Sequence, residues 1–176
     1  SNHTHIFTDG SVSQETNRTA AALVIPKLHI TNRFRLPDKT SIYTAELWAI
    51  YQALINIQKL QLTPTVIISD SYSVLTSLAT GLSKSRKNLL QLTLLKLQEL
   101  TNNHLQTQFM WSPSHIQLPG NELADREAKL GLQEASINPM DHSTQELNSI
   151  IKKSITEQWQ LSWETSTKGR TLHTIQ

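Results

Sequence analysis

Residues 42–68, IYTAELWAIYQALINIQKLQLTPTVII, combine a helical pattern with a strand pattern that follows it closely. Apolar residues recur every three or four positions through residues 42–60, which predicts an amphipathic helix. Pro64 ends the connection, and the β-branched residues 66–68 are suited to a strand that is buried on both faces. If another strand precedes the helix, this order predicts a right-handed crossover between two parallel strands.

Such a strand is predicted near the N-terminus, and two more follow it before the helix. Residues 5–11, 20–25 and 28–36 each carry a strand pattern, and Pro26 and Pro37 interrupt and close the group. The simplest arrangement of these three segments is an antiparallel meander.

The rest of the chain predicts further helices and one more strand. We expect a short helix at residues 73–80, a well-buried leucine-rich helix at 89–100, a strand at 106–111 and a helix at 121–130. The elements together predict an α/β fold with a mixed five-stranded sheet, three strands antiparallel and two parallel, flanked by helices. A separate helical pattern covers residues 144–163.

The composition limits the classes of function without choosing one. Sixteen Lys and Arg against fourteen Asp and Glu give a net charge of +2, which by itself does not indicate a nucleic-acid binder. Cysteine is absent, so disulfides and thiolate zinc sites are excluded. No apolar run approaches the ~20 residues that span a membrane, and no secretion signal opens the sequence. We therefore expect an intracellular protein, in the cytoplasm or nucleus, with no membrane partner.

Three carboxylates form a set that structural roles do not explain, although each aspartate alone would be taken for a turn or cap residue. Glu46 lies in the apolar stripe of its helix, where a charge is costly unless it is paired or bound to a metal. Asp9 and Asp70 each end a predicted strand, at the edge where open α/β sheets place their active sites. Converging carboxylates repel one another unless a cation neutralises them. Oxygen ligands without cysteine favour Mg²⁺, with Mn²⁺ as a substitute.

A second acidic cluster lies within residues 111–125, WSPSHIQLPGNELAD. Glu122 and Asp125 are three positions apart, so they share one face of the predicted helix. His115 lies in the loop before that helix. A lone loop histidine is usually a solvated residue, but one beside two helical acids is a candidate for proton transfer.

Four segments, in this order and spacing, resemble the signatures of the ribonuclease H family over about residues 4–135. They are TDGS at the first strand, AEL in the first helix, SDS after the buried strand, and His115 followed by GNELAD. The resemblance implies the ribonuclease H-like fold. It also implies two Mg²⁺ ions held by four catalytic carboxylates: Asp9, Glu46, Asp70 and Asp125. By the same resemblance, His115 is a catalytic residue that assists product release or proton transfer, and Glu122 is an auxiliary acid.

The reaction that the resemblance implies is endonucleolytic hydrolysis of the RNA strand of an RNA–DNA hybrid, leaving 5′-phosphate and 3′-hydroxyl ends. We expect residues 1–137 to form the catalytic domain and residues 138–176 to form a C-terminal helical extension or linker. We expect substrate contacts from motif residues and from a basic loop: Gly10, Ser11, Ser71, Lys84, Arg86, Lys87 and Asn121.

Two departures from the family pattern concern substrate binding rather than chemistry. Cellular family members usually carry two Asn residues just before the helical Glu, where this chain has Ile42 and Tyr43. Bacterial-type members also insert a basic helix, and here only the loop at residues 84–87 is available. That loop is equally compatible with a contact to the hybrid and with a solvated surface turn.

Two segments carry a narrower likeness. The words SIYTAE at residues 41–46 and the tail at residues 158–170 are similar to non-LTR retrotransposon polyproteins. This likeness implies a role in reverse transcription, with a reverse transcriptase in the same polyprotein as a partner.

Two alternatives stay open from the sequence. One is transposase- or integrase-like DNA strand transfer on a related acidic fold; the GNELAD ending argues against it, and a strand-transfer assay discriminates. The other is a degenerate hybrid-binding domain that only supports a polymerase. The presence of all four acids argues against that alternative, and a nuclease assay decides it.

Overall fold

The computed structural model of the chain describes residues 2–113 and 118–165. The chain divides into two compact units, Ser1–Asp141 and His142–Gln176, and each is described by itself. The first unit contains the sheet and four α-helices, and the second contains helix α5 (Thr144–Thr165).

The sheet of the first unit has the strand order β3-β2-β1-β4-β5. Its strands are β1 (Thr4–Val12), β2 (Thr19–Ile25), β3 (Ile30–Leu36), β4 (Thr65–Ser69) and β5 (Thr107–Trp111). Strands β1, β2 and β3 pair antiparallel, whereas β4 pairs parallel with both β1 and β5. The predicted mixed sheet of three antiparallel and two parallel strands is confirmed.

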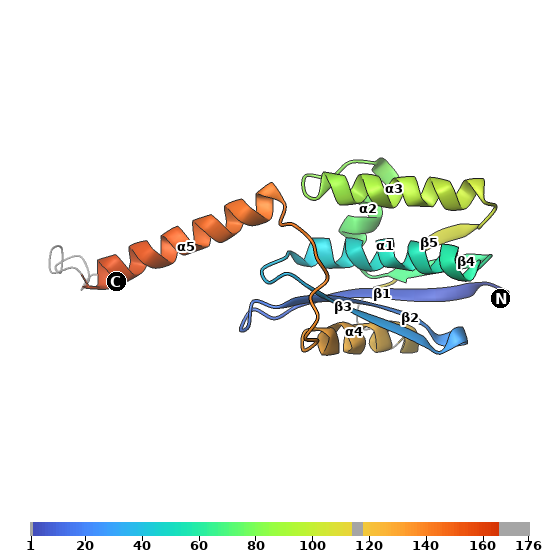
Figure 1. Ribbon diagram of the computed structural model, residues 1–176, viewed down its shortest axis with the longest axis horizontal. Helices are drawn as coiled ribbons and strands as arrows, with labels where there is room; N and C mark the ends of the chain where they lie inside the picture. The colour runs from blue at the N-terminus through green and yellow to red at the C-terminus, as the bar shows by residue number, and fades with distance from the viewer. Residues whose placement is uncertain (1, 114–117, 166–176) are drawn as a thin grey trace. The chain divides into compact units, whose positions relative to one another are not determined.

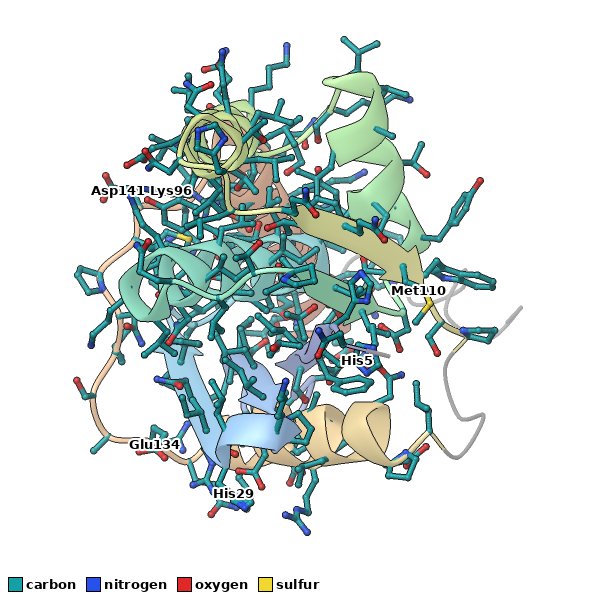
Figure 2. The ribbon with its side chains drawn as sticks, turned by 90° about the vertical axis from the view of Figure 1, so that its right-hand side faces the viewer. His5, His29, Lys96, Met110, Glu134 and Asp141 are labelled. Carbon is teal, nitrogen blue, oxygen red and sulfur yellow. The ribbon has the colours of Figure 1, made fainter. Side chains whose placement is uncertain are left out.

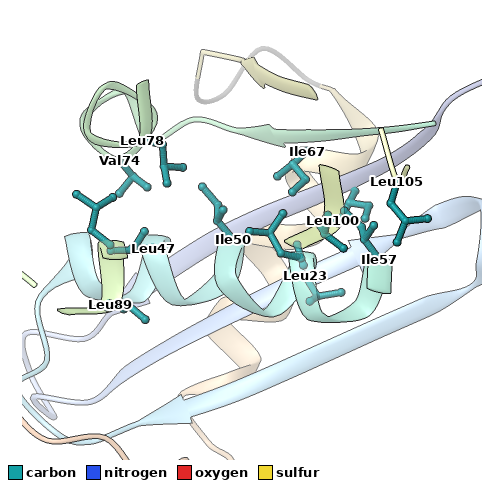
Figure 3. Close-up of a cluster of buried hydrophobic side chains, with 14 of the residues drawn as sticks. Leu23, Leu47, Ile50, Ile57, Ile67, Val74, Leu78, Leu89, Leu100 and Leu105 are labelled. Atoms are coloured by element: carbon teal, nitrogen blue, oxygen red, sulfur yellow. The ribbon is translucent and has the colours of Figure 1, made fainter. Parts of the chain in front are cut away.

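Helix α1 (Ile42–Leu60) lies between the antiparallel strand β3 and the parallel strand β4 in the chain, and it covers one face of the sheet (Figure 1). The side chain of Ser41 accepts a hydrogen bond from the backbone N–H of Thr44, so the first turn is capped. The buried stripe of α1 meets apolar side chains of the sheet, and Leu47, Ile50 and Ile57 point into the cluster that Figure 3 shows. This packing fixes α1 along the central strands.

Helix α4 (Pro119–Gly131) covers the opposite face, as the edge-on view in Figure 2 shows. Its first turn lies so close to β1 that a Cβ at Gly120 would be 2.2 Å from the ring of Phe7. Glycine at this position lets the start of α4 approach the middle of β1. The sheet therefore lies between α1 and α4, which gives the layered architecture of an α/β fold.

Helix α3 (Lys87–Asn102) packs against α1 rather than on the sheet, and the short helix α2 (Tyr72–Thr80) leads to it (Figure 1). The expectation that this leucine-rich segment is well buried was wrong. One side of α3 contributes Leu89 and Leu100 to the core, but Leu92 and Leu95 are 50% and 62% exposed. A helix in an outer layer buries only the side that packs on its neighbour, and its other side stays in solvent.

The edge strand β3 begins later than predicted, because residues Pro26–Leu28 form a short 3-10 turn and His29 takes a left-handed conformation. The segment after α4 returns to this edge, where the backbone N–H of Asn138 donates to the carbonyl of Arg35. The first unit thus continues to Asp141. The division of function between residues 1–137 and 138–176 stays a prediction.

In the second unit, Ser143 and Glu146 cap the start of α5 by reciprocal side-chain to backbone hydrogen bonds. The apolar side chains of Ile151, Ile155 and Trp159 are more than half exposed. Among the described helices, α5 included, none is both long and apolar enough to cross a membrane.

Candidate metal centre

The carboxyl ends of β1 and β4 open into a cleft of about 230 Å³ between α1 and the first turns of α4. Strands β1 and β4 are adjacent and parallel, so Asp9 in the carboxyl half of β1 and Asp70 directly after β4 lie at one edge of the sheet. The residues that line the cleft are mostly acidic or polar: Asp9, Gly10, Ile42, Glu46, Asp70, Asn121, Glu122 and Asp125.

Three of the predicted carboxylates converge in this cleft. One carboxylate oxygen from each of Asp9, Glu46 and Asp70 lies within 4.8 Å of the other two. Asp9 and Glu46 are only 9% and 6% exposed, whereas Asp70 is partly exposed at the cleft mouth. A Cβ at Gly10 would lie 3.0 Å from the backbone nitrogen of Glu46, so the bare glycine backbone lets α1 deliver Glu46 to the strand.

Burial and mutual repulsion oppose ionisation of this cluster. Burial, with the neighbouring charges of Asp70 and Asp125, raises the pKa of Asp9 to about 8, against the opposing influence of Lys129 and of the Gly10 N–H. Burial, followed by the charges of Asp9 and Asp70, holds the pKa of Glu46 well above its ordinary value. Two buried acids that share a cleft in this way require either protons or a cation.

The donor set fits a divalent cation. The Oε2 atom of Glu46 is buried and has no hydrogen-bond partner among the described residues. A buried polar atom without a partner costs free energy, and a metal ion is one partner that would satisfy it. Clustered carboxylate oxygens are the ligands of hard ions such as Mg²⁺ and Mn²⁺. Among the described residues, Asp9, Glu46 and Asp70 each offer one carboxylate oxygen to such an ion.

Asp125 lies in the same cleft but has a different partner. Its Oδ2 accepts a hydrogen bond of 2.7 Å from the Nζ of Lys129, one turn further along α4. Asp125 still contributes to the field of the cleft, because its charge raises the pKa of Asp9. Asn121 and Glu122 lie on the first turn of α4 and line the rim, so the predicted auxiliary acid is close to the carboxylates.

The other predicted site residues are more dispersed. His115 lies outside the described residues. Ser11 and Ser71 are partly exposed and follow Asp9 and Asp70 closely along the chain. Lys84 and Lys87 line a separate surface depression of about 540 Å³ beside Leu82 and Leu90.

Arg86 does not join the two lysines on the surface. It is only 5% exposed, its Nε donates to Thr44 Oγ1, and its Nη1 donates to the carbonyl of Asp141. In the structure it ties the loop before α3 to the start of α1. The exposed basic cluster of the loop is therefore Lys84 and Lys87.

The structure also places two aromatic residues beside the cleft that sequence reasoning did not single out. The indole Nε1 of Trp111 donates to the backbone carbonyl of Asp70 at 3.1 Å, and the backbone N–H of Tyr72 donates to the same oxygen at 2.9 Å. The only sign of this pair in the sequence is that Tyr72 follows Asp70 by two positions. Nothing in the linear sequence brings that residue to Trp111.

Comparison with known proteins adds one match. A family model described as RNase H matches residues 1–133. A search of curated proteins returned no match. The matched segment contains every element that lines the cleft and ends before α5.

Proposed function

Since the chain belongs to the ribonuclease H family, we propose that its acidic cleft hydrolyses the RNA strand of RNA–DNA hybrids by a two-metal-ion mechanism. The family implies cleavage of the RNA strand in hybrids. The observation that supports a metal mechanism is the buried, unpartnered Oε2 of Glu46 among converging carboxylates. Structural acids in a protein interior are normally paired, and this one faces other acids instead.

Asp9, Glu46 and Asp70 would hold the cations, with Asp125 as a further ligand once it leaves Lys129. When bound, two such ions activate the attacking water and stabilise the leaving 3′ oxygen. Because Asp9 and Glu46 are buried, their carboxylates would hold such ions in fixed positions at the carboxyl edge of the sheet. Gly10, Ser11, Ser71 and Asn121 are proposed contacts to the substrate at the rim.

His115 is proposed to carry a proton during turnover or to assist product release, since it precedes the helix that bears Glu122 and Asp125. Replacing it with Ala is expected to slow turnover about 10- to 1000-fold, the range of a general acid–base contribution. Steady-state turnover equal to that of the unmodified protein would remove His115 from the mechanism.

Hybrid affinity would come largely from contacts to backbone phosphates, as in other nucleic-acid binders. Lys84 and Lys87 are exposed and available for such contacts. The wide minor groove of an A-form-like hybrid exposes 2′-hydroxyl groups, through which a protein recognises RNA without reading its sequence.

The biological setting is proposed to be a non-LTR retrotransposon, with a reverse transcriptase in the same polyprotein. The support is the sequence similarity of residues 41–46 and of the tail at residues 158–170, part of which lies outside the described residues. Sequencing the full-length transcript tests this setting. A reverse transcriptase reading frame continuous with this domain is expected, and a transcript without one would contradict the proposal.

The reaction is tested by incubating the protein with a hybrid whose RNA strand is labelled, with Mg²⁺ or with excess chelator. Internal RNA cuts with 5′-phosphate ends are expected only with the metal, and only in the hybrid rather than in duplex RNA or duplex DNA. Hybrid binding without cutting would indicate the degenerate binding domain. Joining of DNA strands would indicate a transposase- or integrase-like activity.

A further inference from the structure

Tyr72 and Trp111 form an exposed aromatic pair beside the proposed metal centre. Their ring centroids are 6.0 Å apart and their planes are inclined by 79°, an edge-to-face arrangement. Tyr72 is 68% exposed and Trp111 is 50% exposed. Met110, the preceding residue of the edge strand β5 (Figure 2), is also 45% exposed.

The pair is attached to the backbone of a proposed metal ligand. Both Tyr72 and Trp111 donate hydrogen bonds to the carbonyl oxygen of Asp70, the former through its backbone N–H and the latter through its indole. Trp111 also stands opposite Ser69 in the parallel register of β4 and β5. The aromatic surface therefore adjoins the carboxyl edge of the sheet, next to the cleft but outside it.

We propose that Tyr72 and Trp111 form a contact surface for the RNA–DNA hybrid, packing against the sugar and base edges of nucleotides next to the scissile phosphodiester. This inference rests on the proposed function. A duplex is far wider than the acidic cleft, so a hybrid with a phosphodiester bond at the carboxylates must also cover the surface that adjoins Asp70. The rings supply apolar contact there, where the minor groove of a hybrid exposes sugars and base edges.

A purely structural role would leave less of these rings in solvent. The core of the unit is formed by aliphatic side chains of the sheet, α1, α2 and α3, and neither Tyr72 nor Trp111 belongs to it. An aromatic side chain brings large contact area at a small cost in side-chain entropy, which suits a binding surface. The backbone hydrogen bond of Tyr72 holds whatever its side chain is, so the ring can be tested separately.

The first test replaces Tyr72 with Ala and with Phe and measures kcat and KM on a labelled hybrid. We expect Tyr72→Ala to raise KM about 5- to 30-fold, within the range of one aromatic contact to a nucleotide. Its kcat should change less than about threefold, because the Asp70 carbonyl keeps its backbone donor. Tyr72→Phe should restore KM to near the original value, since the ring provides the contact.

Leu28→Ala is the matched control. Leu28 is an exposed apolar residue, 41% accessible, on the turn between β2 and β3, at the opposite end of β1 from Asp9. Its replacement should change neither kcat nor KM. Because Tyr72 is exposed and its ring contacts Trp111, the melting temperature of Tyr72→Ala should fall by no more than about a few degrees.

The second test does not need activity. Intrinsic tryptophan fluorescence is recorded while unlabelled hybrid is added in excess chelator, for the original protein and for Trp111→Phe. A change in emission on binding is expected in the original protein, and most of that change should be lost in Trp111→Phe. The loss would assign the signal to Trp111 rather than to Trp48, Trp159 or Trp163.

The outcomes separate this inference from the proposed function. Failure of the original protein to cut any hybrid overturns the proposed function, and the fluorescence titration still decides whether the aromatic surface binds nucleic acid. Normal cutting with an unchanged KM in Tyr72→Ala overturns the aromatic contact alone. A fall in kcat without a change in KM also overturns it, because the residue would then act through Asp70.

Discussion

Two glutamates of the same unit are almost equally buried, and their surroundings are opposite. Glu46 on α1 is 6% exposed and Glu127 on α4 is 4% exposed. Glu127 accepts hydrogen bonds from Arg33 at 2.7 Å and from Arg126 at 3.1 Å. Glu46 faces Asp9 and Asp70, and its Oε2 has no partner among the described residues. One acid is satisfied by the protein, and the other is surrounded by like charges.

The difference shows in the two pKa values. Burial raises the pKa of Glu127, but the hydrogen bonds from Arg33 and Arg126 outweigh burial and hold that pKa below its usual value. For Glu46, burial and the charges of Asp9 and Asp70 act in the same direction and raise the pKa. A buried acid with arginine partners stabilises the fold, whereas a buried acid without a counter-charge is a cost that a bound cation would offset.

The largest expected effect is on catalysis. Glu46→Gln should lower the rate of hybrid cleavage by at least about 10²–10³-fold, the cost of losing one group that stabilises charge in a transition state. Asp70→Asn should lower the rate by several orders of magnitude for the same reason. The measurement is the single-turnover rate on a labelled hybrid in saturating Mg²⁺.

Glu127→Gln is the matched control for catalysis, because it makes the same chemical change at equal burial. Its cleavage rate should stay within about threefold of the original. Equal losses in Glu46→Gln and Glu127→Gln would show that the loss reflects disturbed folding rather than the chemistry of the cleft.

The next effect is the pH dependence of stability in the absence of metal. The pKa of Asp9 is about 8 in the folded protein, against an ordinary value of 3.8. Between these values the folded protein keeps a proton that the unfolded chain has released, so stability falls as the pH rises from about 4 to about 8. The melting temperature in chelator should therefore be lower at about pH 8 than at about pH 5.

Asp9→Asn isolates this contribution from those of other titrating groups. The variant should lose part of the decrease in melting temperature between the two pH values, and in chelator at the higher pH it should melt above the original protein. If the two proteins show the same decrease in melting temperature, the raised pKa of Asp9 does not contribute to the pH dependence of stability.

A third effect concerns stability at neutral pH. Glu127→Gln should destabilise the protein by about 1–3 kcal/mol, because the hydrogen bonds from two charged groups to a buried carboxylate are weakened. The pKa of Glu127 is lowered in the folded state, so this contribution is present above the ordinary glutamate pKa of 4.5 and is lost as the pH falls below it. Urea unfolding of Glu127→Gln and Glu46→Gln in chelator should shift in opposite directions.

The smallest effect is expected at Lys129, the counter-charge of Asp125. Lys129 is 60% exposed, so Lys129→Met should change stability by less than about 0.5 kcal/mol. Removing a cation that competes for Asp125 should lower the Mg²⁺ concentration needed for half-maximal cleavage by a few-fold. An increase in the required Mg²⁺ would contradict competition and indicate that Lys129 contacts the substrate.

The sheet could be predicted from the sequence because its signals are local. The helical period of residues 42–60 and the β-branched run of residues 66–68 together fix the parallel crossover, and the structure places α1 and β4 there. The burial of α3 could not be predicted. Leucine content reports which residues can be buried, but not that α3 packs on α1 with Leu92 and Leu95 left in solvent.

The candidate site was predictable to the extent that topology determines it. Strand ends and a helix stripe are enough to bring Asp9, Glu46 and Asp70 to one edge. The burial of Arg86 could not be predicted from the sequence, because its hydrogen-bond partners Thr44 and Asp141 lie 42 and 55 residues away in the chain. The contact between Tyr72 and Trp111 is likewise a product of tertiary structure.

The central claim is that the clustered carboxylates of Asp9, Glu46 and Asp70 bind a divalent cation. Calorimetric titration with Mg²⁺ near neutral pH, in two buffers of different ionisation enthalpy, gives both the affinity and the number of protons released. Binding should release on the order of one proton, since Asp9 and Glu46 must ionise to hold the metal. Glu46→Gln should weaken binding, whereas Glu127→Gln should bind as the original protein does. Mg²⁺ binding without proton release, or equal binding by Glu46→Gln, would contradict the claim.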